Sequence, residues 1–553
     1  MLSIFKKVVL YFHTLRYLKP QQIYHRIWFR FTKNHSDNSL TPAVRNKLGS
    51  FYSPARRAAS LLDADTLYLL NQSGSLSTIG WGDISETGSH SKLWRYNQHY
   101  FDDLNALNPE SRKHWHLDFL QRWVTENEAG SGVGWDPYPT SLRIVNWVKW
   151  SYAGNALPAA CVQSLAAQAR YLMKRIEWHI LGNHLFANAK ALIFAGLFFS
   201  GNEPDQWLRK GLKIVNDELH EQVLDDGGNF ERSPMYHAIF LEDLLDLLNL
   251  AQAFPDAMSD KNVTHWREVT QSMLYWLNGM VHQDGEISFF NDAGIGIAPS
   301  PAELNAYATK LGLRADSIQA RTIHFTDSGY IRLSSRDALA LLDVAPVGPD
   351  YLPGHAHADT LSFELSLFGQ RVLVNGGTSK YGTDEVRAFE RSTAAHNTVV
   401  VDSENSSEVW GGFRVARRAY PYGLVIDETS DLVSVSCSHD GYQRLPGKPT
   451  HSRKWEFSGS ALTVSDKVDG NFESAVAYFH VHTDISISAN AGGDWLLQLP
   501  QGQKISVNVE TGDPKWSRSY YAPEFGKRFE TQCLEVMLDK EGSRVTISWS
   551  SND

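Results

Sequence analysis

Two different hydrophobic periodicities divide the chain near residue 320. Between about residues 110 and 315, apolar residues recur at the three- and four-residue spacing of amphipathic helices. The predicted helices span 114–127, 141–152, 165–180, 187–199, 211–223, 239–254 and 263–282, and Gly or Pro stands between most of them. Helical hairpins repeat without intervening strand patterns, which predicts an α/α toroid or solenoid.

Beyond residue 320 the apolar residues alternate with polar ones over short runs. The predicted strands are 330–333, 338–343, 361–367, 371–374, 398–402, 424–427, 432–437, 454–457, 462–468, 477–481, 505–509, 534–538 and 545–549. Turn-forming residues separate most of them, as in a large antiparallel sandwich.

These patterns predict a multidomain α+β protein. We expect an N-terminal helical and linker segment (1–60), an incomplete α/α toroid (61–318) and an antiparallel β-sandwich (319–553). A cleft between the two larger domains would be the usual place for a site.

The stretch 353–377 combines polar chemistry with strand-like sequence. His355, His357 and Asp359 stand two residues apart, so an extended backbone would place all three side chains on one face. Alternation over 361–367 predicts a half-buried strand, and the run 371–374 completes a hairpin. The imidazoles would then face a ligand at the mouth of a sheet, or else bond only to water and backbone.

Two further stretches place polar side chains at the start of apolar helices. In 182–188, Asn183 could cap a helix, or Asn183 and His184 could act together at its positive end. In 225–237, the side chains of Glu231, Tyr236 and His237 could project into a cleft. Taken alone, a core tyrosine with a satisfied hydroxyl is the simpler interpretation of Tyr236.

Aromatic and histidine-rich stretches supply two more candidate sites. The segment 93–101, which includes Tyr96 and His99, is consistent with a saccharide groove and equally with an aromatic core. The segment 391–398 carries His396, which could share a metal with His357 and with an oxygen ligand from Asp359 or Asn375.

Charge and cysteine content narrow the classes of function. The net charge of -10 and pI of about 6.1 argue against a nucleic-acid binder, although a local basic cleft could still accept an anionic glycan. The three cysteines have no CxxC spacing, so neither a disulfide framework nor a thiolate zinc site is indicated.

The N-terminal segment is basic and aromatic. Its apolar run at 8–12 is short, is interrupted by His13 and lacks a small-residue cleavage site, so no clear signal peptide is expected. It is also too short and too charged to span a bilayer. It could associate peripherally with a membrane or pack as an amphipathic helix on its own domain.

One reaction would use all of these groups: β-elimination from a uronic acid. The C5 proton lies alpha to a carboxylate and is poorly acidic. An amide, a protonated histidine or an arginine must therefore neutralise the negative charge of the carboxylate. A base must take the C5 proton, and an acid must protonate the leaving glycosidic oxygen. No paired catalytic carboxylates stand out, which weighs against ordinary glycoside hydrolysis.

The sequence resembles the heparinase II/III family of polysaccharide lyases. The resemblance rests on GNHLFANAKAL (182–192), DGGNFERSPMYH (226–237), PGHAHADTLSFEL (353–365) and FERSTAAHNTVVVD (389–402), and it covers about 90–550. It implies an α/α toroid followed by an antiparallel β-sandwich, and β-elimination from a glycosaminoglycan-like, uronic-acid-containing polysaccharide.

The resemblance also implies roles for individual residues. Asn183, with His184, would neutralise the uronate carboxylate. Tyr236 would be the base and also the acid, and His355 would be its acid/base partner. The weaker substrate contacts would be Arg143 and Glu231, with Tyr96, His99 and His237 added from their own segments.

Some family members bind zinc between sheet residues, and the matching positions here are His357, Asn375 and His396. The middle position is Asp in that pattern, and a neutral amide is a poorer zinc ligand than a carboxylate. The chemistry itself would need no cofactor, so any Zn²⁺ would be structural.

The N-terminal segment resembles that of family members associated with bacterial exopolysaccharide, capsule or O-antigen production. The expected partner is therefore an acidic polysaccharide. The expected location is the bacterial cytoplasm or inner-membrane surface, with the periplasm left open. Two alternatives stay open: a uronyl C5-epimerase of the same fold, and a non-catalytic glycan-binding protein of polysaccharide assembly.

Overall fold

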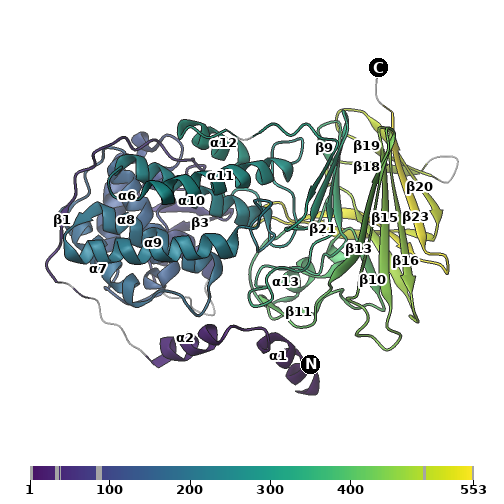
Figure 1. The fold of residues 1–553 in the computed structure, drawn as a ribbon, viewed down its shortest axis with the longest axis horizontal. Helices are drawn as coiled ribbons and strands as arrows, with labels where there is room; N and C mark the ends of the chain where they lie inside the picture. The colour runs from purple at the N-terminus through teal and green to yellow at the C-terminus, as the bar shows by residue number, and fades with distance from the viewer. Residues whose placement is uncertain are drawn as a thin grey trace.

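The computed structural model describes residues 4–31, 37, 39–82, 90–314, 316–489 and 494–550. A helical N-terminal part and a sheet-rich C-terminal part lie side by side (Figure 1). The predicted architecture, an α/α toroid followed by an antiparallel β-sandwich, is confirmed. Of the predicted helical and linker segment 1–60, residues 1–3, 32–36 and 38 lie outside the described residues.

Each of the seven helices predicted between 114 and 282 overlaps an observed helix. The observed helices are α5 (Lys113–Glu126), α6 (Pro137–Tyr152), α7 (Ala159–Lys174), α8 (Gly182–Phe198), α9 (Asn202–Gln222), α10 (Pro234–Ala253) and α11 (Asp260–Gly279). Four shorter helices were not predicted: α3 (Leu76–Ile79), α4 (Lys92–Gln98), α12 (Pro301–Lys310) and α13 (Glu385–Glu390).

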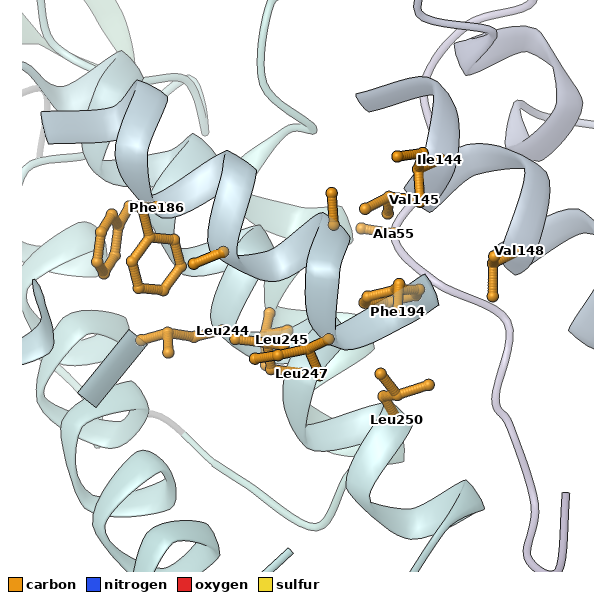
Figure 2. Packing of buried hydrophobic residues seen from close by; sticks show 14 of the residues in the cluster. Ala55, Ile144, Val145, Val148, Phe186, Phe194, Leu244, Leu245, Leu247 and Leu250 are labelled. Carbon is orange, nitrogen blue, oxygen red and sulfur yellow. The ribbon is translucent and has the colours of Figure 1, made fainter. Parts of the chain in front are cut away.

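Helix α8 lies at the centre of the toroid. Nearly all of its residues, including the polar Asn188 and Lys190, are buried, so neighbours cover every face of the helix. It packs against α6, α7, α9 and α10. Figure 2 shows part of this core, with Phe186 and Phe194 of α8 close to leucines of α10. The start of α8 is thereby held rigidly.

Three antiparallel sheets build the C-terminal part. The first contains β5 (Thr322–Phe325), β6 (Tyr330–Ser334), β7 (Ala338–Asp343), β8 (Phe363–Leu367) and β9 (Gln370–Leu373) in that order. The second has the order β10-β17-β22-β21, with bounds Val399–Val401, Ala475–His480, Phe529–Met537 and Asp513–Tyr521.

The third sheet has eight strands in the order β13-β14-β15-β16-β23-β20-β19-β18. Their bounds are Pro421–Glu428, Leu432–His439, Thr450–Ser458, Ala461–Asp469, Ser543–Trp549, Lys504–Thr511, Trp495–Gln498 and Ser486–Ala489. Three short pairs complete the strands: β1 (Ala43–Val44) with β4 (Phe199–Ser200), β2 (Thr66–Leu69) with β3 (Gln72–Ser75), and β11 (Val409–Trp410) with β12 (Arg414–Val415).

Strand β7 shows how the two parts are joined. Ala338, Ala340 and Leu342 face the interior of the sandwich, where all three large sheets contribute side chains. Leu339 and Leu341 point the other way, into a second cluster that contains Trp276 and Met280 of the α11 region. Because successive side chains of a strand alternate in direction, this one strand serves both cores.

The expectation of a half-buried strand at 361–367 is wrong. Every residue of β8 is buried. Its polar side meets the segment after α11, where His282 Nε2 donates to Glu364 Oε2 at 2.9 Å and Ser366 Oγ lies 2.7 Å from His282 Nδ1. Polar and apolar residues therefore do alternate along this strand, but the polar side chains face other protein groups and not solvent.

Two helices precede the toroid: α1 (Ile4–Leu15) and α2 (Pro20–Phe31). They run along the lower edge of the molecule in Figure 1, outside both domains. Among the described residues, none of the helices combines the length and the apolar character that crossing a bilayer requires.

Candidate functional site

The first turn of α10 positions Tyr236. Ser233 caps the helix by accepting a hydrogen bond from the backbone N–H of Tyr236, and its hydroxyl donates to the carbonyl of Asp292. The Tyr236 ring stacks on the His355 imidazole with centroids 3.9 Å apart and planes 31° apart. The toroid and the loop before β8 thus place a phenol and an imidazole in direct contact.

Asp292, which the sequence did not single out, orients His355. His355 Nδ1 donates to Asp292 Oδ2 at 3.0 Å. In the neutral imidazole this leaves Nε2 without a proton, and Nε2 lies 3.9 Å from Glu231 Oε2. The His355 side chain keeps 15% of its surface exposed, so Nε2 can serve as a hydrogen-bond acceptor for a bound molecule.

Asp292 is itself held ionised by several donors. Burial opposes its charge, but Arg387 and the imidazoles of His355 and His357 hold its pKa well below the usual value. Arg387 forms a bidentate ion pair with both carboxylate oxygens. The fixed negative charge stabilises the Nδ1–H tautomer of His355.

A second phenol, Tyr381, was also missed by the sequence reasoning. Its hydroxyl lies 2.8 Å from the hydroxyl of Tyr236, and its ring lies over Arg387. Burial, together with Tyr381 and Asp292, raises the pKa of Tyr236 well above its usual value. Tyr236 is therefore a protonated phenol in this structure, able to donate its proton.

The start of α8 supplies the opposite side of the cluster. His184 stacks on Tyr138 at 4.4 Å, and its Nδ1 donates to Glu177 Oε1 at 3.1 Å. Burial disfavours a charge on His184, but Glu177 more than offsets this and raises the pKa of His184. Asn183 precedes it in the first turn of α8, at the positive end of the helix dipole.

Glu231 links the two sides. The backbone N–H of Asn183 donates to its carboxylate, and His355 and His184 both lie close enough to lower its pKa. Burial nevertheless dominates and raises the pKa of Glu231. Within the part of the chain that is described, its Oε2 atom has no hydrogen-bond partner. Glu231 therefore lies between the two imidazoles as an incompletely paired buried carboxyl group.

Several residues next to this cluster have strained backbone conformations. Leu181, Arg232 and Asn291 adopt left-handed φ values of 71°, 57° and 57°. Each of them lies within three residues of a residue of this cluster. Gly182 has φ of 55°, which favours glycine, and a Cβ there would also lie 2.4 Å from Leu352 Cδ2 and displace that side chain. Strained conformations of this kind cost about 1–3 kcal/mol each and are typical of functional sites.

The predicted metal ligands are only partly brought together. His357 Nδ1 and His396 Nε2 lie 3.1 Å apart, with His357 Nε2 bonded to Asp292 and His396 Nδ1 to the carbonyl of Ser392. The side-chain amide of Asn375, in contrast, is already hydrogen-bonded. Its Oδ1 accepts from the backbone N–H of Asn397, and its Nδ2 donates to the carbonyl of Phe289.

Two imidazole nitrogens alone do not make a zinc site, because structural zinc takes four ligands. The described residues contain no group of three or more His, Cys, Asp or Glu side chains arranged to hold a metal. Of the three ligands that the resemblance implied, His357 and His396 direct ring nitrogens at each other, whereas the Asn375 amide is engaged with backbone groups. The segment 353–361 is also not extended: His355 and His357 both reach Asp292, whereas Asp359 accepts from Asn291 N.

Three of the predicted substrate contacts need correction. Arg143, His99 and His237 are fully buried. The Arg143 guanidinium donates to Gln168 and to the carbonyl of Gly134 and covers Trp123, whose indole N–H donates to His99. His237 Nε2 bonds to the carbonyl of Met273. These side chains support the toroid core and present no surface to a substrate.

Tyr96, on α4, remains half-exposed, and its hydroxyl donates to Asp136. It belongs to a group of tyrosines on the toroid side that also contains Tyr100 and Tyr138, whose rings lie 6.0 Å apart. Flat rings of this kind bind sugar faces, so Tyr96 stays a candidate substrate contact.

Comparisons with known proteins agree with the fold and the motifs. Residues 151–308 match the model "Heparinase II/III N-terminus", and residues 318–550 match "Heparinase II/III-like, C-terminal". A heparin-sulfate lyase of Bacteroides stercoris is 26% identical over 259 residues, which are 40% of this chain and 36% of that protein. This match thus spans about a third of the length of the relative.

Another relative is matched over more of its length. FtsZ-localized protein C of Caulobacter vibrioides is 26% identical over 75% of this chain and 74% of that protein. Among solved structures, a crystal structure of heparinase III superimposes with a TM-score of 0.69 at 16% identity, covering 86% of this chain and 81% of that one.

The heparan sulfate lyase HepC of Pedobacter heparinus gives a TM-score of 0.59 at 17% identity, over 85% of this chain and 78% of that one. At these identities the structural likeness establishes the fold alone, and the two family models, which cover consecutive parts of the chain, establish the family. The chain belongs to the heparinase II/III family.

Proposed function

We propose that this protein is a polysaccharide lyase that cleaves a uronic-acid-containing polymer by β-elimination. The observation that carries the proposal is the contact between Tyr236 and the Asp292-oriented His355, with the His184–Asn183 pair on the other side of Glu231. The family membership and the lyase relatives support the same reaction class.

The carboxylate of the sugar would meet the start of α8. His184 carries a positive charge whenever it is protonated, and the neighbouring Glu177 favours that form. Asn183 adds an amide donor at the helix N-terminus. Neutralising the carboxylate stabilises the negative charge that develops at C5 when the proton leaves, which is the main barrier to the reaction.

The proton transfers would be shared between His355 and Tyr236. His355 Nε2 has its lone pair free because Nδ1–H is committed to Asp292, so it can take the C5 proton. Tyr236 is protonated and can donate to the leaving glycosidic oxygen. In this proposal Tyr236 acts as the acid. The role of base, which the resemblance implied for Tyr236, needs the phenolate form, which the raised pKa disfavours in the unliganded site.

The test is to incubate the protein with a panel of uronic-acid polymers, including acidic bacterial exopolysaccharides. Elimination creates a 4,5-unsaturated uronate, which absorbs in the ultraviolet, whereas Tyr236→Phe should give no such signal. Absence of absorbance with every polymer would refute the lyase. Solvent deuterium at C5 of an uncleaved polymer would assign a C5-epimerase instead.

One observation favours a second candidate, a non-catalytic glycan-binding protein. The relative matched over three quarters of the chain is named for a location, not for a reaction. Under this alternative the wild type and Tyr236→Phe bind an acidic polysaccharide equally well, and neither changes it. Measuring binding and product with the same polymers separates the two candidates.

A further inference from the structure

Exposed apolar side chains are concentrated on the two N-terminal helices. Among the described residues, 25 large apolar side chains are exposed, and 11 of them lie on α1 and α2. They are Ile4, Phe5, Val8, Tyr11, Phe12, Leu15, Ile23, Tyr24, Ile27, Trp28 and Phe31. A helix packed on its own domain would bury this face, but α1 buries only Leu10 and α2 only Gln22.

On each helix these side chains form one continuous face. At about 100° per residue, the exposed apolar residues of α1 fall within an arc of about 120°, and those of α2 within about 140°. Lys7 borders the apolar arc of α1, and Arg26 and Arg30 border that of α2. All three of these basic side chains are exposed.

The segment also has a charge opposite to that of the remaining chain. Its first 33 residues contain seven Lys and Arg and no Asp or Glu. The remaining residues contain 45 Lys and Arg against 62 Asp and Glu. Positive charge is therefore gathered beside the exposed apolar faces, and the acidic remainder would repel an anionic partner from other surfaces.

The opposite faces of the helices are fixed to the body of the protein. On α1, Thr14 Oγ1 accepts from the Trp410 indole N–H at 3.1 Å, which attaches this helix to the β11–β12 pair. On α2, Arg175 covers the Phe29 ring at 3.7 Å, and Gln22 Nε2 donates to the carbonyl of Tyr351. Apart from Tyr11, whose ring contacts Trp410 with centroids 4.8 Å apart, the apolar faces consequently point away from both domains.

We propose that α1 and α2 form a docking surface for an anionic lipid bilayer. Helices with one apolar face and basic borders lie in the plane of a membrane, where the apolar side chains enter the acyl boundary and the basic ones meet anionic headgroups. A second copy of the chain fits poorly, because two such basic surfaces repel each other. A hydrated acidic polysaccharide would leave the apolar faces exposed to water.

The test is co-sedimentation of the full chain with vesicles of phosphatidylglycerol and phosphatidylethanolamine, compared with phosphatidylcholine alone. We expect binding to the anionic vesicles, weakened by about 0.5 M salt. Arg26→Glu combined with Arg30→Glu should lower the partition at least about tenfold. Phe5→Ser with Phe12→Ser, or Ile27→Ser with Phe31→Ser, should lower it similarly.

Matched control changes keep the result interpretable. Phe529→Ser with Met537→Ser removes two exposed apolar side chains from β22 and should leave vesicle binding intact. Hydrogen–deuterium exchange should show protection confined to residues 4–31 when vesicles are added. None of these measurements depends on catalytic activity. A negative result would therefore refute the membrane-docking inference without bearing on the lyase proposal.

Several results would overturn the inference. Equal binding to both vesicle types, or binding that survives the apolar substitutions, would mean that α1 and α2 do not dock on anionic lipid. Loss of a dimer in the same variants, with no vesicle binding by the wild type, would assign the surface to a second copy. Binding to heparin that needs Arg26 and Arg30 but not the apolar residues, again without vesicle binding, would assign it to a polyanion.

Discussion

At the scale of single residues, the contact between two phenols and one imidazole defines what the site can do. Tyr236 and Tyr381 share a hydrogen bond of 2.8 Å, but only Tyr236 stacks closely on His355. Tyr236→Phe should therefore lower kcat at least about 100-fold, the usual scale for a lost acid/base group. Ultraviolet product assays on the purified variant measure this.

Tyr381→Phe is the matched comparison. It removes the hydrogen-bond partner of Tyr236 without removing the donor, so the expected loss is smaller, about tenfold in kcat. Thermal midpoints of both variants should stay close to the wild type, since each keeps its ring. Equal losses in the two variants would mean that both hydroxyls are needed for the proton transfer, and a larger loss in Tyr381→Phe would make Tyr381 the donor.

His184 gives the site a pH dependence with a definite sign. Its pKa is raised, so the protonated form that neutralises the substrate carboxylate persists above the usual titration range of histidine. As pH rises through the raised pKa this charge is lost, and kcat/KM should fall, because the same charge binds the carboxylate and stabilises the negative charge that develops at C5. His184→Gln should show a kcat/KM at least about tenfold lower that no longer depends on pH in this range. A pH-dependent kcat/KM in that variant would place the titrating group elsewhere.

Short motifs revealed some of these residues and concealed others. Tyr236, His355, His184 and Glu231 stand in polar clusters at the start of apolar helices or strands, which is a local signal. Asp292 stands in a loop with no such pattern, and its importance follows only from the three side chains that converge on it. Arg143 shows the reverse: a polar residue in a helix that proved to be an internal support.

At the scale of elements, a cross-strand ion pair stabilises the middle of the large sheet. Arg453 of β15 and Asp466 of β16 are paired in register, fully buried and joined by two hydrogen bonds of 2.6 and 2.9 Å. Asp466→Asn would leave the guanidinium without its counter-charge. We expect a loss of about 3–5 kcal/mol in the free energy of unfolding at neutral pH.

The same pair predicts a specific acid dependence. Burial opposes the Asp466 charge, but Arg453 and His451 lower its pKa to about 2, below the ordinary value of 3.8. The stabilisation is therefore complete above about pH 4 and is lost as pH falls toward 2. In thermal melts, the difference between wild type and Asp466→Asn should narrow over this window. A constant difference would assign the effect to packing.

Elements with a strong period were predicted better than those without one. The toroid helices are long and repeatedly amphipathic, and each prediction overlaps an observed helix, although the predicted start of α9, residue 211, falls well inside the observed helix Asn202–Gln222. Strands β18, β19 and β21 were missed, since they are short or lie largely at the surface, where alternation between apolar and polar residues is weak. Strand β8 was found but assigned the wrong exposure, because sequence alternation does not reveal what covers its polar side.

At the scale of the whole molecule, the site exists only because the two domains are held together. Tyr236 and His184 come from the toroid, whereas His355 and Tyr381 come from the sandwich. Trp276 of α11 is fully buried at their interface, against Phe325 and Tyr330, and donates its indole N–H to Ser328 at 2.8 Å. Trp276→Ala should cost about 3–5 kcal/mol, the usual range for such truncations.

Because Trp276 lies at the interface, its removal should weaken the contact between the two domains, so that they no longer unfold together. Calorimetry of Trp276→Ala should show two separated unfolding transitions where the wild type shows one, with kcat/KM reduced although no site residue has changed. Trp455→Ala, a fully buried tryptophan inside the sandwich, is the matched control: it should lower stability without lowering kcat/KM at temperatures where the protein is folded. An equal fall in kcat/KM for both variants would mean that general destabilisation, and not domain placement, limits the site.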